Sequence, residues 1–242
     1  MKIFSLMSFV AGLLLLTGCT FTETLSLNED GGGKLSVKMD ASELMSLAGT
    51  EMGEDLSEKI DTVIVFKDIL ENQKDSIAKL PLEDQQRLLA LKPYNIHIYL
   101  DEPNKKFFYD VYLNFNEVSE ADKIFEVYNH LSEAGGTVDN EDGGIKQESI
   151  KVNYSYKNKV FKRKAYIADI ALHQRELDSL QGSEMILEAT TYKLDYSFPR
   201  KIKSVSNQDA LVGEDGKTLM YEVGYMDYFK NPEILDIEVI LE

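Results

Sequence analysis

The stretch NIHIYLDEPNKKFFYDVYLNF, residues 95–115, carries the clearest structural pattern in this chain of 242 residues. Apolar and polar side chains alternate in it on either side of Asp101-Glu102-Pro103-Asn104, a run of residue types that favour turns. Alternation with a period of two gives each strand one buried and one solvated face, which is typical of antiparallel sheet. The stretch therefore predicts a β-hairpin.

The same alternation recurs along the chain and predicts further strands. It marks a hairpin at 21–40, another at 151–167, and single strands at 192–198, 219–225 and 235–241. Amphipathic spacing predicts helices at 81–91, 119–131 and 170–180, while residues 54–80 carry both strand and helix signals. These patterns predict an α+β fold, an antiparallel sheet built from several β-hairpins with amphipathic helices packed on it.

Composition limits the classes of function. The formal net charge is −16, which argues against nucleic-acid binding because phosphate contacts depend on Lys and Arg. The same charge argues against electrostatic adhesion to anionic lipid. Cys19 is the only cysteine, so internal disulfides are excluded, and a hydrophobic content of 43% must supply the stabilising core.

The first 18 residues have the features of an export signal. Lys2 supplies a positive charge, residues 3–16 carry no charge, and the small pair Thr17-Gly18 precedes Cys19. The apolar run is too short for a comfortable membrane span, which needs roughly 20 residues. Residues 20–34 are polar and Gly-rich, so we expect Cys19 to have no core to enter.

Leu16-Thr17-Gly18-Cys19 resembles the lipobox of bacterial lipoproteins, residue for residue. The resemblance implies cleavage before Cys19, a diacylglycerol on its sulfur, and a further acyl chain such as palmitate on the new amino group. Two or more chains anchor a protein durably. In diderm members of this family, Asp directly after the cysteine marks retention in the inner membrane. Thr20 and Phe21 lack this signal, which implies the periplasmic face of the outer membrane.

These features divide the chain into three parts. Residues 1–18 are predicted to be a signal peptide that is removed, and residues 19–33 a lipid-anchored N-terminus with the first hairpin turn. Residues 34–242 are predicted to form a globular α+β body, with a candidate sub-boundary in the acidic, Gly-rich segment 133–147. In general character the body resembles uncharacterised bacterial envelope lipoproteins.

The sequence shows no motif for catalysis or metal binding. His97, His130 and His173 are far apart and belong to no zinc motif, and no G-x-S-x-G or phosphate-loop pattern occurs. The loops at 28–39 and 139–150 lack the bidentate Glu that an EF-hand calcium loop needs at its last position. We therefore predict no cofactor, no metal site and no catalytic residue, and we favour a non-enzymatic protein.

A basic cluster stands out in this acidic chain. Five basic residues fall within eight positions, interleaved with aromatic ones: Lys157, Lys159, Lys162, Arg163 and Lys164. Alternation places Lys162 and Lys164 on one strand face and Arg163 on the other. One interpretation is a docking edge for an acidic envelope protein, a lipid headgroup or a cell-wall polymer. The other is an edge strand whose lysines block unwanted pairing. A smaller basic group would join the cluster if the two segments are neighbours: Arg200, Lys201 and Lys203.

The sequence thus favours a membrane-anchored bacterial envelope lipoprotein whose body is a non-enzymatic binding or scaffolding module of unknown ligand. One alternative is an envelope hydrolase that uses dispersed carboxylates, which an adjacent carboxylate pair would support. The other is a carrier that holds an apolar ligand in a Tyr- and Phe-lined hollow beneath the sheet, which a dry hollow would support.

Overall fold

Residues 95–115 form the hairpin that their alternation predicts. The structure is a computed structural model and describes residues 18–48, 59–128, 149–180, 182 and 184–242. Strand β4 (Tyr94–Asp101) pairs antiparallel with β5 (Lys106–Phe115). Asn104 N donates to Asp101 O at 3.2 Å, and Lys105 takes a positive φ of 52°, so the chain reverses tightly between the two strands.

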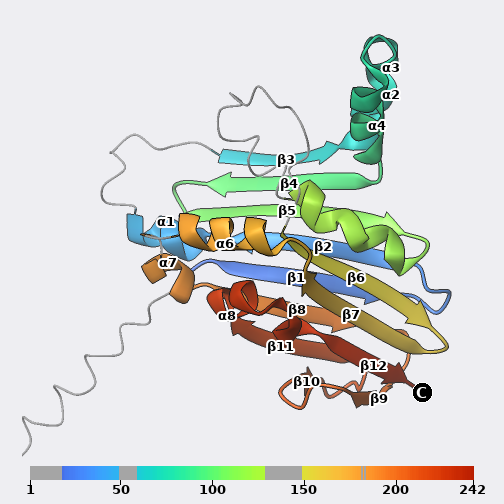
Figure 1. Ribbon diagram of the computed structural model, residues 1–242, viewed down its shortest axis with the longest axis vertical. Coiled ribbons are helices and arrows are strands. Elements are labelled where there is room, and N and C mark those ends of the chain that lie inside the picture. The colour runs from blue at the N-terminus through green and yellow to red at the C-terminus, as the bar shows by residue number, and fades with distance from the viewer. Residues whose placement is uncertain (1–17, 49–58, 129–148, 181, 183) are drawn as a thin grey trace, which may run out of the picture.

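The β4–β5 hairpin belongs to a larger sheet of eight strands in the order β10-β11-β8-β1-β2-β5-β4-β3, as Figure 1 shows. The other strands are β1 (Thr20–Leu27), β2 (Gly33–Asp40), β3 (Lys59–Val65), β8 (Thr191–Ser197), β10 (Leu211–Val212) and β11 (Thr218–Gly224). Neighbouring strands are antiparallel except β1 and β8, which run parallel. The predicted hairpin at 21–40 is confirmed as β1 and β2.

A smaller sheet of four strands has the order β6-β7-β12-β9. Its strands are β6 (Ile150–Lys157), β7 (Val160–Ile167), β9 (Ile202–Val205) and β12 (Ile237–Leu241). Asn158 and Lys159 join β6 to β7 with φ of 53° and 64°, the geometry of the two-residue turn that matches the twist of a hairpin. The predicted hairpin at 151–167 is therefore confirmed.

The helices lie between the hairpins. They are α1 (Ser42–Ala48), α2 (Phe66–Asn72), α3 (Lys74–Ile77), α4 (Leu82–Ala90), α6 (Ile170–Ser179), α7 (Glu184–Glu188), α8 (Tyr225–Lys230) and the 3-10 helices η2 (Val118–Lys123) and η3 (Pro232–Leu235). Helices α4 and α6 confirm two predicted helices. The third begins with η2 and continues to 128, and its last three predicted residues lie outside the described part. Since η3 ends at Leu235, β12 begins two residues later than predicted.

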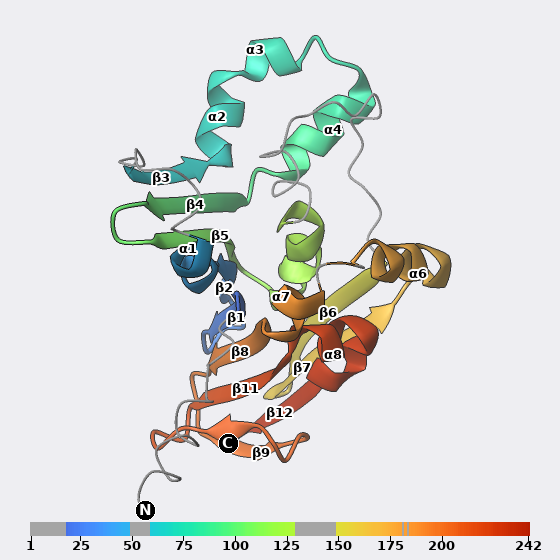
Figure 2. The ribbon, with the colours of Figure 1, turned by 90° about the vertical axis from the view of Figure 1, so that its left-hand side faces the viewer.

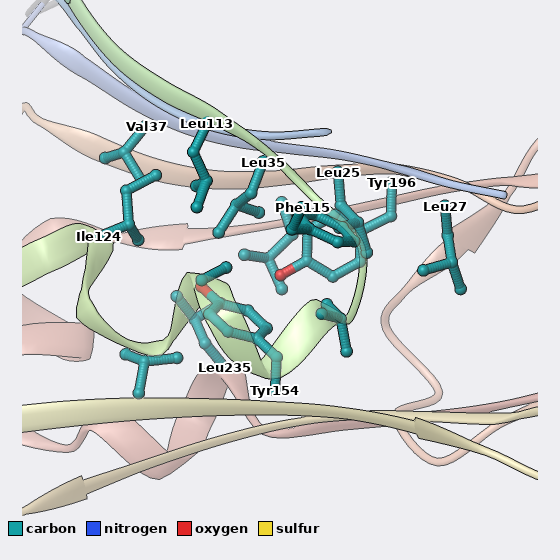
Figure 3. Packing of buried hydrophobic residues seen from close by; sticks show 14 of the residues in the cluster. Leu25, Leu27, Leu35, Val37, Leu113, Phe115, Ile124, Tyr154, Tyr196 and Leu235 are labelled. Carbon is teal, nitrogen blue, oxygen red and sulfur yellow. The ribbon is translucent and has the colours of Figure 1, made fainter. Parts of the chain in front are cut away.

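The two sheets face each other across one core. The smaller sheet and the helical segment 118–128 cover one face of the larger sheet, while α2, α3 and α4 project beyond β3 and β4 (Figure 2). Figure 3 shows Leu25, Leu35 and Leu113 of the larger sheet pointing toward Ile124, Leu235 and the ring of Tyr154. All six side chains belong to a single buried cluster. The α+β class is confirmed. The smaller sheet, together with helices, covers the larger one, whereas the sequence predicted only helices there.

Strand β1 is central to this body. It lies between β2 and β8 in the larger sheet and contributes Leu25 and Leu27 to the core. The structure therefore places residues 20–27 within the globular unit, although the division predicted from the sequence begins that unit at residue 34. The candidate sub-boundary at 133–147 lies outside the described residues, and the core includes side chains from both sides of it.

Candidate functional site

Cys19 lies at one end of the larger sheet, directly before the first residue of β1. Its backbone oxygen accepts a hydrogen bond from Thr191 N at 3.1 Å, which ties it to the start of β8. Thr20 pairs with Asp40, the last residue of β2, and α1 follows at once. We call this end, formed by the starts of β1 and β8, the end of β2, and α1, the Cys19 end.

The Cys19 side chain is 9% exposed, which corrects the expectation that it has no core to enter. Gly18 packs so closely that a β-carbon there would lie 2.3 Å from Ala189 O. Burial, followed by the negative charges of Asp40 and Glu43, raises the pKa of the thiol. In the folded full-length chain the sulfur is therefore a poor nucleophile, because the thiolate is the reactive form.

Strand β7 carries the predicted basic cluster and alternates as expected. Lys162 and Lys164 are exposed on one face, whereas Arg163 is fully buried on the other. Lys157 and Lys159 are exposed at the turn that connects β6 to β7. The five basic residues therefore have three different environments.

The exposed lysines on β7 are paired with acidic residues next to or within β12. Lys162 Nζ lies 2.6 Å from Glu238 Oε2, and Lys164 Nζ lies 2.7 Å from Asp236 Oδ2. Because β7 lies between β6 and β12, the interpretation of β7 as an edge strand protected by lysines is wrong. The lysines instead form opposite-charge pairs across neighbouring chain segments.

Arg163 does not belong to an exposed docking surface, which corrects its assignment to one. Its Nη2 lies 3.0 Å from Oε2 of Glu23 on β1, and both side chains have 0% exposure. Nε donates to both carboxylate oxygens, at 3.2 and 3.1 Å, and Nη1 donates to Leu235 O at 3.2 Å. Nη2 is not aligned for a hydrogen bond. This ion pair connects the two sheets through the middle of the core.

Three tyrosines complete the Glu23–Arg163 cluster. Tyr154 OH donates to Glu23 Oε1 at 2.8 Å, Tyr192 OH donates to Oε2 at 2.9 Å, and Tyr196 OH also donates to Oε1. Burial, followed by the charge of Glu23, raises the pKa of all three phenols well above the usual value, so they remain donors. Burial alone would lower the pKa of Arg163, but Glu23 and the tyrosines hold it well above its usual value.

Glu23 belongs to no motif, but its position in the strand pattern carries a signal of burial. Glu23 shares a strand face with Leu25 and Leu27, so a charged residue occupies a place where alternation predicts an apolar one. Arg163 likewise shares the buried face of β7 with Phe161. Opposite charges at inward positions of two strands indicate a buried pair, because an unpaired buried charge is very costly.

His173 forms a second polar cluster with Ser149 and Glu176. Its Nδ1 lies 3.1 Å from Ser149 Oγ, which in turn donates to a carboxylate oxygen of Glu176. Serine, histidine and a carboxylate are the groups of a hydrolytic triad, but there the histidine lies between the other two. Here the serine does, and it is only 2% exposed. The cluster is suited to holding α6 against the start of β6.

His97 has other partners than the residues of the Ser149–His173–Glu176 cluster. His97 Nε2 on β4 lies 2.8 Å from Asp61 Oδ1 on β3, and its partly exposed ring packs edge-on against Phe108 at 5.0 Å. His130 lies outside the described residues.

Two glycine-rich loops carry acidic residues of the kind that bind cations. The first is the turn between β1 and β2, where Asp30 Oδ1 accepts from Gly32 N at 3.1 Å. The second, at 139–150, lies almost wholly outside the described residues. Within the described ranges, no group of three or more His, Cys, Asp or Glu side chains is placed to hold a metal ion.

The two predicted basic groups are neighbours, joined by the C-terminal strand. Lys159 O accepts from Leu241 N, and Lys201 O accepts from Glu242 N, both at 2.9 Å. Arg200 Nε lies 2.7 Å from Glu29 Oε2 on the β1–β2 turn. The two segments are therefore neighbours, and the ion pair of Arg200 with Glu29 offsets part of their charge.

Comparisons with known proteins do not assign the chain to a family. No family model matches it, and no curated protein matches its sequence. Among solved structures, the folded domain of the LppM protein from Mycobacterium tuberculosis, determined by NMR, is similar over 93% of this chain and 93% of its own, with a TM-score of 0.39 and 8% identity. A score of this size carries no conclusion about fold or function. No helix in the described ranges has the length and apolar character to cross a membrane.

Proposed function

We propose that the chain is a bacterial envelope lipoprotein, anchored by acyl chains on Cys19, whose body is a non-enzymatic binding or scaffolding module. The observation that carries the proposal is Leu16-Thr17-Gly18-Cys19, which resembles a lipobox at every position and follows a charged residue and an uncharged apolar stretch. Thr20 at the next position favours the periplasmic face of the outer membrane in a diderm host.

The burial of Cys19 dictates when acylation takes place under this proposal. Its sulfur is nearly inaccessible once Cys19 O is bonded to Thr191 N. Acylation and cleavage therefore precede the packing of β1 beside β8. Cleavage also removes Gly18, which packs closely against Ala189 in the full-length chain.

The packing of the core supports a binding or scaffolding body over a carrier or a hydrolase. Aromatic rings that a carrier would use to line a hollow pack on one another, with Phe161 5.5 Å from both Tyr196 and Phe198. Tyr154 and Tyr192 direct their hydroxyl groups at Glu23. The Ser149 hydroxyl is likewise committed to Glu176.

Replacement of Cys19 by Ala tests the anchor. In a diderm bacterium that processes lipoproteins, the native chain is expected in the membrane fraction, at the mass of residues 19–242 plus acyl chains. Cys19→Ala is expected to retain residues 1–18 or to leave the membrane fraction, while the control Thr20→Ala behaves as the native chain. Recovery of Cys19→Ala in the membrane fraction at the normal mature mass would contradict the proposal.

Lys157 and Lys159 are exposed at the turn between β6 and β7, whereas the exposed Lys162 and Lys164 of the predicted partner-binding surface are paired with Glu238 and Asp236. Exposed charges are screened over about 8 Å at physiological salt, so an acidic partner held there should dissociate as salt rises. Lys157→Glu with Lys159→Glu is expected to abolish capture of that partner and its salt dependence without lowering Tm. The control Lys67→Glu with Lys79→Glu makes the same charge change on α2 and in the turn after α3, and it should leave capture intact. Equal capture by both double variants would refute a docking role.

A further inference from the structure

We propose that the Cys19 end of the larger sheet is a membrane-contacting surface, so that the body stands directly on the bilayer. This inference rests on the proposed lipid anchor and adds the orientation of the body to it. The occupant of the surface is the headgroup layer of the membrane that holds the acyl chains.

The first reason is the length of chain between the anchor and the fold. Strand β1 begins at Thr20, one residue after the proposed site of acylation. Cys19 is itself fixed by the hydrogen bond from Thr191 N to its carbonyl oxygen. A flexible linker would let the body move away from the surface in proportion to its length, and no such segment separates Cys19 from β1.

The second reason is that the Cys19 end is a broad face rather than a single strand tip. Ala41 N donates to Phe107 O at 3.0 Å, which brings the end of β2 beside the start of β5. Tyr225 N donates to Thr190 O at 2.9 Å, which brings the end of β11 beside the start of β8. Helices α1 and α7 lie at the same end (Figure 1). Acyl chains leaving Cys19 thus emerge among six elements that can rest on the headgroups together.

The β6–β7 turn with Lys157 and Lys159 lies next to the opposite end of the larger sheet. Leu27 pairs with Gly33 there, and a β-carbon on Gly31 would lie 3.5 Å from Tyr156 Cδ1. A strand of eight residues spans roughly 26 Å, which separates this end from the membrane surface. Lys157 and Lys159 therefore face away from the anchoring bilayer, so their partner is not a headgroup of that bilayer.

Two positions on β5 test the orientation as a matched pair. Lys106 and Asn114 are both exposed and share one strand face, with Lys106 at the Cys19 end and Asn114 at the other. The variants Lys106→Cys and Asn114→Cys are made in the full acylated chain, and a spin label is attached to each. The labelled chains are placed in vesicles of phosphatidylethanolamine, phosphatidylglycerol and a nickel-chelating lipid. Headgroup nickel is expected to relax the label at 106 strongly and the label at 114 weakly. Equal relaxation at both positions would overturn the proposal.

A linker variant and a mass measurement separate the possible failures. A flexible Gly-Ser linker inserted between Cys19 and Thr20 is expected to remove the difference between the two labels. If the linker variant kept the full difference, the claim that the short connection fixes the orientation would be wrong. A chain without acyl mass that does not float with the vesicles would refute the lipid anchor itself. If an acylated chain floated with the vesicles but nickel relaxed both labels equally, only the proposed contact surface would be refuted.

Discussion

At the scale of single residues, the Glu23–Arg163 cluster is the most demanding feature of the core. A buried carboxylate and guanidinium lose their hydration, and this cost is offset only when geometry and hydrogen bonding are good. Here Tyr154 donates to Oε1 of Glu23, Tyr192 donates to Oε2, and Arg163 Nε donates to both oxygens. Because Glu23 is on β1 and Arg163 on β7, the pair also fixes how the two sheets are placed against each other.

Removal of either charge should therefore be far more damaging than removal of both. Arg163→Met or Glu23→Leu alone is expected to lower the free energy of unfolding by about 3–5 kcal/mol, because one buried charge is left unpaired. The double variant should lose much less than the sum of the two. Urea unfolding measures all three variants.

The neighbouring residue Lys162 provides the control for this cycle. Its exposed ion pair with Glu238 should be worth no more than about 1 kcal/mol, so Lys162→Met is expected to unfold nearly as the native chain does. If Arg163→Met were as mild as Lys162→Met, the pair would not be a determinant of stability.

Asp101, at the turn of the β4–β5 hairpin, gives the fold a dependence on acid. Hydrogen bonds from the Asn104 side chain and then from Lys59 lower the pKa of the Asp101 carboxyl to about 2. Its unfolded value is about 3.9. A depressed pKa contributes stability that is present above the unfolded value and lost as pH falls toward the folded value.

We therefore expect Asp101→Asn to lower Tm near neutral pH and to have a shrinking effect as pH falls from about 4 to about 2. Thermal unfolding across this range measures the difference. Asp75→Asn, an exposed acid on α3, serves as the control and should show a small, flat difference. A gap between Asp101→Asn and the native chain that persists undiminished at about pH 2 would exclude this linkage.

At the scale of elements, local patterns identified the hairpins but could not identify their distant partners. Alternation placed Arg163 on the face of β7 opposite Lys162 and Lys164, but its partner Glu23 lies 140 residues away in sequence, and no local pattern joins them. The parallel pairing of β1 with β8 likewise joins segments far apart in sequence that no local pattern connects. The contact at the edge strand β6 is also distant in sequence: Tyr154 N of β6 donates to Oδ1 of Asp122 in η2 at 2.7 Å. Cys19 was identified by its motif, whereas its burial depends on β8.

The arm formed by α2, α3 and α4 should be the least stable of the described elements. Helix α4 has no buried residue, and its Leu82 and Leu89 are 76% and 51% exposed. Helix α6 has a similar length, but it buries His173 and has an N-cap hydrogen bond from Leu172 N to Asp169. Amide hydrogens of α4 are expected to exchange at least about a hundredfold faster than those of α6, which corresponds to about 2.7 kcal/mol in opening free energy.

A pair of variants within the arm checks the origin of this difference. Leu89→Ala should change stability by under about 0.5 kcal/mol because its side chain is exposed. Leu91→Ala removes a buried side chain that is 7% exposed and should cost about 2–5 kcal/mol. Equal protection of α4 and α6, or a large cost for Leu89→Ala, would mean that the arm is packed more firmly than its exposure indicates.

At the scale of the whole molecule, the first strand and the last one hold the body together. Strand β1 lies at the middle of the larger sheet, and β12 lies in the interior of the smaller one. Side chains from Leu25 to Leu241 belong to one core. A chain whose N-terminal strand is central cannot complete its sheet until that strand is in place, which links the anchor at Cys19 to the folding of the entire body.

Two truncations of different length should therefore have opposite results. A chain that begins at Thr20 is expected to fold as a soluble monomer, since the core requires neither lipid nor disulfide. It should unfold in a single cooperative transition, as one shared core requires. A chain that begins at Asn28 lacks Glu23, Leu25 and Leu27, leaves Arg163 unpaired, and separates β2 from β8, so it is expected not to fold. Near-ultraviolet circular dichroism and calorimetry distinguish the two chains. Two separate transitions in the longer chain would show that the parts on either side of 133–147 fold independently. Native-like packing in the shorter chain would show that the body folds without β1.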